Sequence, residues 1–449
     1  MLGIGGAGMS GIARILAAQG HRVSGTDLQM NSACRDLAEN GIKVMIGHSP
    51  DNLDPDVDLV VYSSAVPASN AEMMEAGRRG IATVKRGDML ARIVENSHCI
   101  AVAGAHGKTT ISSMISMALE QCGCQPSFVV GGNLQGTNTN AALGAGKYFV
   151  IEADESDASF LALSPYIAVV SNIEGDHLEY YQSVEKISEA FISFIGQTRP
   201  GGFALLCGDD PGIKEIRTHL TVPTIFYGEH EDNDYRLTDW QPQGRGSRCL
   251  VYRHGECLGS LELTIPGRHN SLNALAAVAV GMECGQGFAD LSAALNGFRG
   301  AQRRFEIVGE TEGITIVDDY AHHPTEVCAT IKAARHAHAG RLTAVFQPHR
   351  YTRTERFFRE FGSCFGEADR VILTDVYSAG EAPIAGVSGE LIFKETRRLL
   401  GERVSYIPDK NALASFILGE VRTGDMVLCM GAGDIWKTAS EVAAALSEA

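Results

Sequence analysis

The sequence predicts an α/β fold built from parallel sheets in more than one domain. Short apolar runs alternate along the chain with segments whose apolar residues recur at helical spacing. Glycine turns or polar clusters follow many of the runs, as they do at the carboxyl ends of strands in open parallel sheets. Because 449 residues exceed one ordinary core, two to four domains are expected. The alternation falls into three stretches, at 1–93, 94–303 and 304–449.

The first stretch begins with a glycine-rich turn of GxGxxG spacing, followed by a helix and a strand at 21–27. Glycines at this spacing let a backbone approach a diphosphate, and an acid after the second strand accepts from a sugar hydroxyl. A later strand, at 59–62, ends in two serines that could meet a phosphate or sugar. Since only Met1 and Leu2 precede the glycines, we expect a truncated or mis-assigned first strand. The candidate contacts are Gly5, Gly6, Ala7, Gly8, Asp27, Ser63 and Ser64.

A second glycine turn, AGAHGKTT at 103–110, lies between a short apolar run at 99–102 and a helical segment at 111–122. A turn in this place presents backbone N–H groups and the positive end of a helix, which both favour a polyphosphate. Lys108 would supply a point charge to the outer phosphates, and the Thr109 hydroxyl a ligand to Mg²⁺. The two glycines stand closer together than in the usual phosphate loop, so the turn is a shortened form.

Acidic clusters follow the next two buried-looking strands. The strand at 148–151 runs into four carboxylates within 152–157, and the strand at 167–173 ends in two acids and His177. In a parallel sheet both clusters should converge on the phosphate loop, where Mg²⁺ needs one or two protein oxygen ligands. For any single acid, a helix cap or a solvated turn remains the alternative.

The segment at 220–265 is more polar and is predicted to form a small antiparallel flank. It is followed by GRHNSLN at 267–273 and an alanine-rich helix. Asn and His at the start of a helix are often only caps, but they can also present polar groups to a base.

The third stretch restarts the alternation, with strands at 314–317, 342–346, 371–373 and 426–430, each followed by a polar cluster. His349, Arg350 and Arg353 form a compact cationic patch after the second of these strands. The patch suits a carboxylate or phosphate, although the arginines could instead pair with nearby acids.

Composition excludes several classes of function. A net charge of −16 and a pI near 5.3 argue against nucleic acid as a partner. No apolar run approaches the roughly 20 residues that cross a bilayer, and the start lacks a basic segment followed by an apolar one, so we expect neither membrane insertion nor export and a cytoplasmic location. The 11 cysteines are scattered without a CxxC pair, which disfavours a zinc site or a disulfide framework.

Eight motifs together resemble the Mur ligase family, the ATP-dependent ligases of peptidoglycan synthesis, and the resemblance covers essentially the whole chain. The last three resemble the branch that adds L-alanine to UDP-N-acetylmuramate; the loop alone would fit any Mur ligase or the related folylpolyglutamate synthases. In chain order the motifs are GAHGKTT, EADESD, NIEGDH, GRHNSLN, RRFE, DDYAHHPTE, QPHRYTRT and VYSAGEAPI.

The resemblance implies three domains: an N-terminal Rossmann-like domain for the UDP-sugar at 1–93, a central P-loop ATPase domain at 94–303, and a C-terminal Rossmann-like domain for the amino acid at 304–449. The N-terminal glycine loop would then hold the UDP diphosphate rather than NAD. The implied reaction passes through an acyl phosphate on the lactyl carboxylate and gives UDP-N-acetylmuramoyl-L-alanine, ADP and phosphate. The implied protein is a bacterial monomer or weak homodimer that uses ATP and two Mg²⁺ ions.

The resemblance also assigns roles to single residues. Lys108, His177 and Arg304 would be catalytic, with Thr109, Glu152 and His177 as metal ligands and His349, Arg350 and Arg353 in the alanine pocket. Ala105 departs from the family, which usually has Thr there and so one more hydroxyl near the phosphates. The implied ATP contacts are Gly104, Ala105, His106, Gly107, Lys108, Thr109, Thr110, His269, Asn270, Asn273, Arg304 and Asp319.

Three alternatives remain. A murein peptide ligase would attach a tripeptide to the same sugar, but the crowded cationic patch suits a small amino acid. An NAD-dependent oxidoreductase would use the N-terminal glycine turn and leave the GKTT loop unexplained. A nucleotide-gated binding protein would hold ATP without ligase activity.

Overall fold

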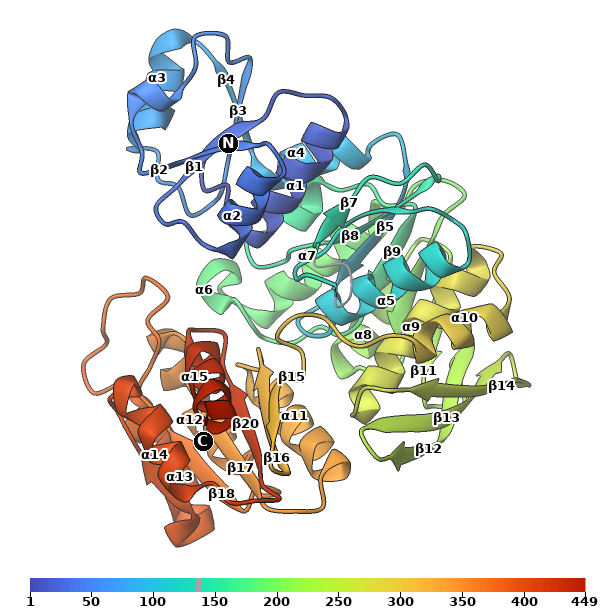
Figure 1. Cartoon of the computed structure of the whole chain (residues 1–449). Helices are drawn as coiled ribbons and strands as arrows, with labels where there is room; N and C mark the ends of the chain where they lie inside the picture. The colour runs from blue at the N-terminus through green and yellow to red at the C-terminus, as the bar shows by residue number, and fades with distance from the viewer. Residues whose placement is uncertain (135–138, 449) are drawn as a thin grey trace. The chain divides into compact units, whose positions relative to one another are not determined.

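The structure is a computed structural model that describes residues 1–134 and 139–448 (Figure 1). The chain divides into two compact units. The first comprises Met1–Thr238, Leu250–Ser260 and Leu272–Leu295. The second comprises Asp239–Cys249, Leu261–Ser271 and Asn296–Ala449.

The N-terminal part of the first unit alternates strands and helices as predicted. Its strands form two parallel pairs, and Leu2 makes a parallel bridge to Thr26 in one pair and to Tyr62 in the other. Leu2 therefore lies between the pair β1–β2 and the pair β3–β4 and connects them. The predicted strand at 21–27 is shorter than expected. The strands are β1 (Ser24–Asp27), β2 (Lys43–Ile46), β3 (Leu59–Tyr62) and β4 (Ala82–Lys85); the helices are α1 (Ala7–Ala18), α2 (Ser32–Glu39), η1 (Pro50–Asn52), α3 (Ala71–Arg79) and α4 (Arg86–Val94).

The central sheet has ten strands in the order β14-β13-β12-β11-β10-β9-β5-β8-β6-β7. β5 lies between β8 and β9 and is parallel to both, so the three carboxyl ends share one edge of the sheet. The strands are β5 (His98–Ala103), β6 (Ser127–Val129), β7 (Ala141–Ala142), β8 (Tyr148–Glu152), β9 (Ile167–Val170), β10 (Phe203–Cys207), β11 (Thr224–Gly228), β12 (Tyr235–Gln243), β13 (Gly246–Arg253) and β14 (Glu256–Leu263).

The predicted flank at 220–265 is not separate from this sheet. β12 pairs in parallel with β11 through Tyr227 and Tyr235, and it continues the order into β13 and β14. An unpaired edge of β11 would expose backbone N–H and C=O groups, and the added strands satisfy them. Short turns join β12 to β13 and β13 to β14, as expected for the antiparallel hairpins predicted there.

Helices cover the central sheet, and α5 lies beside β5 and β8 (Figure 1). Several serines are buried in α5, and Ser112 and Ser116 each donate to a backbone carbonyl of the preceding turn. The helices are α5 (Lys108–Gln121), η2 (Ser159–Ala162), α6 (Leu178–Tyr181), α7 (Val184–Gly196), α8 (Pro211–Ile216), η3 (Arg217–His219), α9 (Arg268–Glu283) and α10 (Phe288–Asn296).

The C-terminal sheet in the second unit has the order β15-β16-β20-β17-β18-β19. Only β15 is antiparallel to its neighbour. The last strand, β20, lies between β16 and β17. The elements are β15 (Glu306–Thr311), β16 (Ile314–Asp319), α11 (Pro324–Ala337), β17 (Leu342–Phe346), α12 (Tyr351–Ser363), β18 (Arg370–Leu373), α13 (Gly389–Leu400), η4 (Gly401–Arg403), β19 (Val404–Tyr406), η5 (Lys410–Ala412), α14 (Leu413–Glu420), β20 (Met426–Met430) and α15 (Ile435–Glu448).

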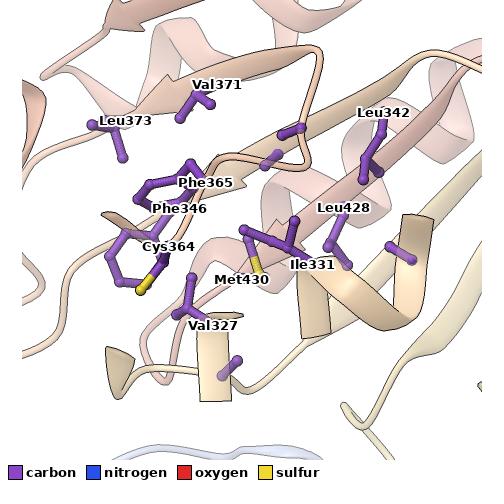
Figure 2. Packing of buried hydrophobic residues seen from close by; sticks show 14 of the residues in the cluster. Val327, Ile331, Leu342, Phe346, Cys364, Phe365, Val371, Leu373, Leu428 and Met430 are labelled. Atoms are coloured by element: carbon purple, nitrogen blue, oxygen red, sulfur yellow. The ribbon is translucent and has the colours of Figure 1, made fainter. Parts of the chain in front are cut away.

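Two apolar cores cover the two faces of the C-terminal sheet, because successive strand residues point to opposite faces. Leu342 and Phe346 of β17 pack with α11, α12 and α13, whereas Val345 packs with α14 and α15. Figure 2 shows the first core, where Phe346 lies close to Phe365. The sheet is thus fixed from both sides, and the loops at its carboxyl edge are held on a rigid base.

Candidate active site

The phosphate loop joins β5 to α5, as the sequence predicts. A Cβ added at Gly104 would lie 2.2 Å from the Ser171 hydroxyl oxygen, so only glycine fits beside the end of β9. Gly107 has φ +84° and directly precedes α5. Within the described part of the chain no side chain caps the start of α5. Its first N–H groups therefore lack a side-chain acceptor, which fits the binding of a phosphate.

Asn172 holds the loop in place from the end of β9. The His106 backbone N–H donates to Asn172 Oδ1 at 2.8 Å, and Asn172 Nδ2 donates to the His106 carbonyl at 3.1 Å. The His106 ring lies 3.3 Å from Glu174 Oε2, measured from Nε2. The conformation of the loop is thus set by the neighbouring strand as well as by its glycines.

Lys108 is only 15% exposed and points back over the loop. Its ammonium donates to the Gly104 carbonyl at 2.7 Å and to Glu155 Oε1 at 2.8 Å. Burial alone would lower the pKa of Lys108, but Glu155, Glu152 and Asp154 together raise it above its ordinary value. The lysine therefore stays cationic, as a phosphate ligand requires.

The acidic clusters converge on the loop, as predicted. Thr109 Oγ1 donates to Glu152 Oε2 at 2.9 Å, and the Gly131 N–H donates to the same oxygen at 2.8 Å. His177 Nε2 lies 3.8 Å from Glu155 Oε1. The buried Oε2 of Glu155 has no hydrogen-bond partner among the described residues. Mg²⁺ prefers oxygen ligands. The Thr109 hydroxyl and the carboxylates of Glu152 and Glu155, one oxygen of which is unsatisfied, provide such ligands beside the phosphate loop.

The N-terminal glycine loop is held by the acid that follows β1. The Gly5 N–H donates to Asp27 Oδ2 at 2.9 Å. Gly6 and Ala7 are exposed where α1 begins, and no described side chain caps this helix. Ser63 accepts from the Ala65 N–H at 3.3 Å, whereas Gly8 is partly buried and Ser64 is exposed. The loop thus offers free helix-start amides, while Asp27 orients the loop backbone.

The GRHNSLN motif lies within the first turns of α9, not before the helix. In the first unit, the Asn273 side-chain oxygen would lie 2.9 Å from a Cβ added at Gly107, so Asn273 borders the phosphate loop. In the second unit, Asn270 Nδ2 donates to the Pro266 carbonyl at 2.7 Å. Burial lowers the pKa of His269 to about 4, so the ring is neutral near pH 7.

Arg303 and Arg304 are adjacent but make different contacts. Arg303 has φ +59°, and its guanidinium donates to Asp318 Oδ2 at 2.9 Å and to the Gly431 carbonyl at 2.6 Å. Arg304 lies over the Tyr320 ring and 3.9 Å from a carboxylate oxygen of Glu326. Arg303 thus fixes the segment before β15, while Arg304 is 28% exposed and able to reach a ligand.

Asp319 is buried at the end of β16. Its carboxylate accepts from the Phe305 N–H at 2.7 Å and from the Ala321 N–H at 2.8 Å. The nearby charge of Arg304 and these hydrogen bonds lower the pKa of Asp319. Burial has the larger effect and raises this pKa to about 6. Asp319 therefore shapes the turn that carries Arg304, and its ATP contact stays a prediction.

The cationic patch after β17 is compact. Arg353 is 6% exposed, and its Nη1 lies 3.2 Å from His349 Nδ1. The His349 ring is parallel to Tyr377, with ring centroids 5.8 Å apart. Arg350 has φ +68° and lies 4.0 Å from a Glu381 oxygen. The structure brings the three predicted residues together, and Arg350 is at ion-pair distance from an acid.

Two residues that shape the loop had no predicted role. Asn172 lies in the predicted strand at 167–173, and Glu155 is one of the four carboxylates after β8. A sequence signal existed for both, since each lies at a strand end beside the loop. Which carboxylate would face Lys108 depends on the path of the turn after β8, which residue spacing does not fix.

Family models match the chain in three consecutive parts. The Mur ligase family catalytic domain matches residues 1–98, the Mur ligase middle domain residues 102–281, and the Mur ligase glutamate ligase domain residues 303–433. The chain belongs to the Mur ligase family, whose members are ATP-dependent, amide-forming ligases.

Members of this family with a named activity match the chain over its whole length. UDP-N-acetylmuramate–L-alanine ligases of Syntrophomonas wolfei and Desulforamulus reducens are 50% and 46% identical, each over 100% of this chain and 97% of its own. The solved UDP-N-acetylmuramate-alanine ligase of Thermotoga maritima is 28% identical, with a TM-score of 0.85 over 100% of this chain and 98% of its own. A murein peptide ligase of Psychrobacter arcticus, 24% identical with a TM-score of 0.73, shares the fold over 100% of this chain and 98% of its own.

Proposed function

We propose that the protein joins L-alanine to the lactyl carboxylate of UDP-N-acetylmuramate at the expense of ATP, in peptidoglycan synthesis. The observation that carries the proposal is the full-length identity of 50% and 46% to relatives with that named activity. The chemistry of the site supports it, because the loop around Lys108 combines helix-start amides, a buried cation and converging acids. We also infer that the protein acts in the bacterial cytoplasm, as a monomer or weak homodimer.

The first half-reaction transfers the terminal phosphoryl group of ATP to the carboxylate. An oxygen of the carboxylate bonds to phosphorus, the bond to the bridging oxygen breaks, and ADP leaves. Two anions must approach each other, so neutralising charge is the main task of the site. Lys108 carries a permanent positive charge at the loop, and the amides at the start of α5 add partial positive charge.

Thr109, Glu152 and His177 are the residues that would hold Mg²⁺. A Mg²⁺ ion held there would supply positive charge that offsets the repulsion between the phosphates and the carboxylate. Thr109 and Glu152 already contact each other at 2.9 Å, which fixes both oxygens before a ligand arrives. Glu155 both orients Lys108 and lies 3.8 Å from His177, so it couples the lysine to the histidine.

In the second half-reaction the alanine amine attacks the acyl carbon, and phosphate leaves as the amide forms. His349, Arg350 and Arg353 would bind the amino acid, with Arg353 taking its free carboxylate through a two-pronged contact. The stacked His349 and Tyr377 rings restrict the room beside Arg353. A small amino acid suits this patch better than a tripeptide.

Turnover with purified protein tests the proposal. UDP-N-acetylmuramate and ATP are supplied with L-alanine or with the tripeptide L-alanyl-γ-D-glutamyl-meso-diaminopimelate, and ADP release and the new amide are followed together. We expect amide formation with L-alanine. Turnover with the tripeptide alone would replace the proposal with a murein peptide ligase, and ADP release without both other substrates would favour a nucleotide-gated binding protein.

A further inference from the structure

Arg86 lies between the N-terminal glycine loop and the turn after β8. It is the first residue of α4, directly after β4, and its side chain is 16% exposed. On one side a Cβ added at Gly8 would lie 3.0 Å from Arg86 Nη1 and 3.2 Å from its Cδ, so the guanidinium packs against the N-terminal glycine loop. On the other side Nη2 donates to Asp154 Oδ2 at 2.8 Å and lies 3.6 Å from Asp157 Oδ2.

Asp154 is built to hold this arginine. The backbone N–H and the hydroxyl of Ser156 donate to Asp154 Oδ1 at 3.0 and 2.7 Å, which leaves Oδ2 for Arg86. Asp154 therefore fixes one prong of the guanidinium.

The second prong has no such partner. Nη1 makes no hydrogen bond to any residue that the structure describes, and it faces Gly8 at the exposed start of α1. No described side chain caps α1 either. A half-paired guanidinium next to uncapped helix-start amides has the geometry of an anion site, since Arg binds phosphate groups through separate prongs.

We propose that Arg86 is a binding residue for the diphosphate of the sugar nucleotide, with Nη1 on the phosphate and Nη2 on Asp154. Asp154, which is not among the proposed metal ligands, is then a positioning residue that holds Arg86 in place. The proposal rests on the proposed function, because that function places a UDP-sugar at this loop.

The test measures binding by calorimetry with the full chain, so that it does not depend on turnover. UDP-N-acetylmuramate, UDP and ATP are titrated into wild type, Arg86→Ala, Arg86→Lys, Asp154→Asn and the double variant Arg86→Ala/Asp154→Asn. Arg92→Ala is the matched control, because Arg92 lies exposed on the same helix.

We expect Arg86→Ala to weaken UDP and UDP-N-acetylmuramate binding about tenfold or more, as for the loss of a charged hydrogen bond. ATP affinity should stay within about twofold. Arg86→Lys should recover only part of the lost UDP affinity, because an ammonium cannot contact Asp154 and a phosphate at the same time as a guanidinium can. Asp154→Asn should weaken UDP binding less than Arg86→Ala, and the double variant should be no weaker than Arg86→Ala.

UDP affinity within about twofold of wild type in Arg86→Ala would overturn the role of Arg86 while leaving the proposed function intact. If both Arg86 variants lost as much ATP affinity as UDP affinity, that would also overturn the role of Arg86, because it would show that Arg86 only stabilises the structure. A wild-type protein that binds neither UDP nor UDP-N-acetylmuramate would overturn both proposals. Arg86→Lys keeps the positive charge. UDP binding to this variant therefore tests the phosphate contact even if Arg86→Ala folds poorly.

Discussion

Lys108 and Glu155 form a buried ion pair at 2.8 Å, in which the carboxylate comes from the turn after β8 and the ammonium from the first residue of α5. Each partner therefore depends on the parallel pairing of β5 and β8 for its place. The pair holds the lysine over the Gly104 carbonyl before any nucleotide binds.

Glu155→Gln should lower kcat/KM for ATP about thirtyfold or more, because it leaves Lys108 without its buried partner. Lys108→Ala should abolish turnover in a protein that still folds, with a lower thermal midpoint because Glu155 loses its buried partner. Glu120→Gln, at an exposed position of α5, is the control and should change neither quantity. Coupled ADP-release assays measure the first effect and calorimetric melting the second. Near-normal turnover in Lys108→Ala would refute its assigned role.

Thr109→Ala should raise the Mg²⁺ concentration for half-maximal turnover by roughly tenfold to a hundredfold, since it removes a hydroxyl that contacts Glu152. Thr109→Ser keeps that hydroxyl and should stay close to wild type. Mg²⁺ titrations at saturating ATP, after treatment with a chelator, measure this. Equal Mg²⁺ dependence in the Ala and Ser variants would exclude Thr109 as a ligand.

Arg303→Ala and Arg304→Ala should separate stability from catalysis at adjacent positions. Arg303 pairs with the buried Asp318, so its loss should destabilise the protein by about 3 kcal/mol and lower the thermal midpoint by roughly 5–10 °C. Arg304→Ala should leave the midpoint nearly unchanged and lower turnover. Melting curves and turnover assays on both variants measure the two effects. A lower midpoint in Arg304→Ala and lower turnover only in Arg303→Ala would contradict the roles given to the two arginines.

Arg353→Ala should raise the KM for alanine by about tenfold to a hundredfold, because a buried guanidinium is lost from the cationic patch. The KM for ATP should change little. Arg356→Ala, exposed on the same helix, serves as the control. An unchanged dependence on alanine in Arg353→Ala would argue against the pocket.

Asp319 should make stability depend on pH. Its pKa is about 6 when folded against an ordinary value of 3.8, so between these values the folded state binds more protons and stability falls as pH rises. Relative to Asp319→Asn, wild type should lose about 2 kcal/mol of unfolding free energy between pH 4 and 6. Urea unfolding of both proteins across this range measures the difference, and parallel curves would contradict it.

The sequence was sufficient to predict the loop and the strands around it. The order of apolar run, glycine turn and helix at 99–122 predicts β5 and α5, and parallel strand ends explain why Glu152 and His177 come close to the same loop. Spacing could not separate Arg303 from Arg304, because the positive φ of Arg303 turns the two side chains to different partners. It also could not show Arg86, whose importance depends on a contact with Asp154, 68 positions later.

The C-terminal sheet has a consequence for biosynthesis. β20, made from residues 426–430, lies between β16 and β17, which are translated about a hundred residues earlier. A nascent chain on the ribosome therefore exposes the inner edges of β16 and β17 until β20 has been made. Since unpaired strand edges invite association with other chains, the nascent chain is open to such association during this interval.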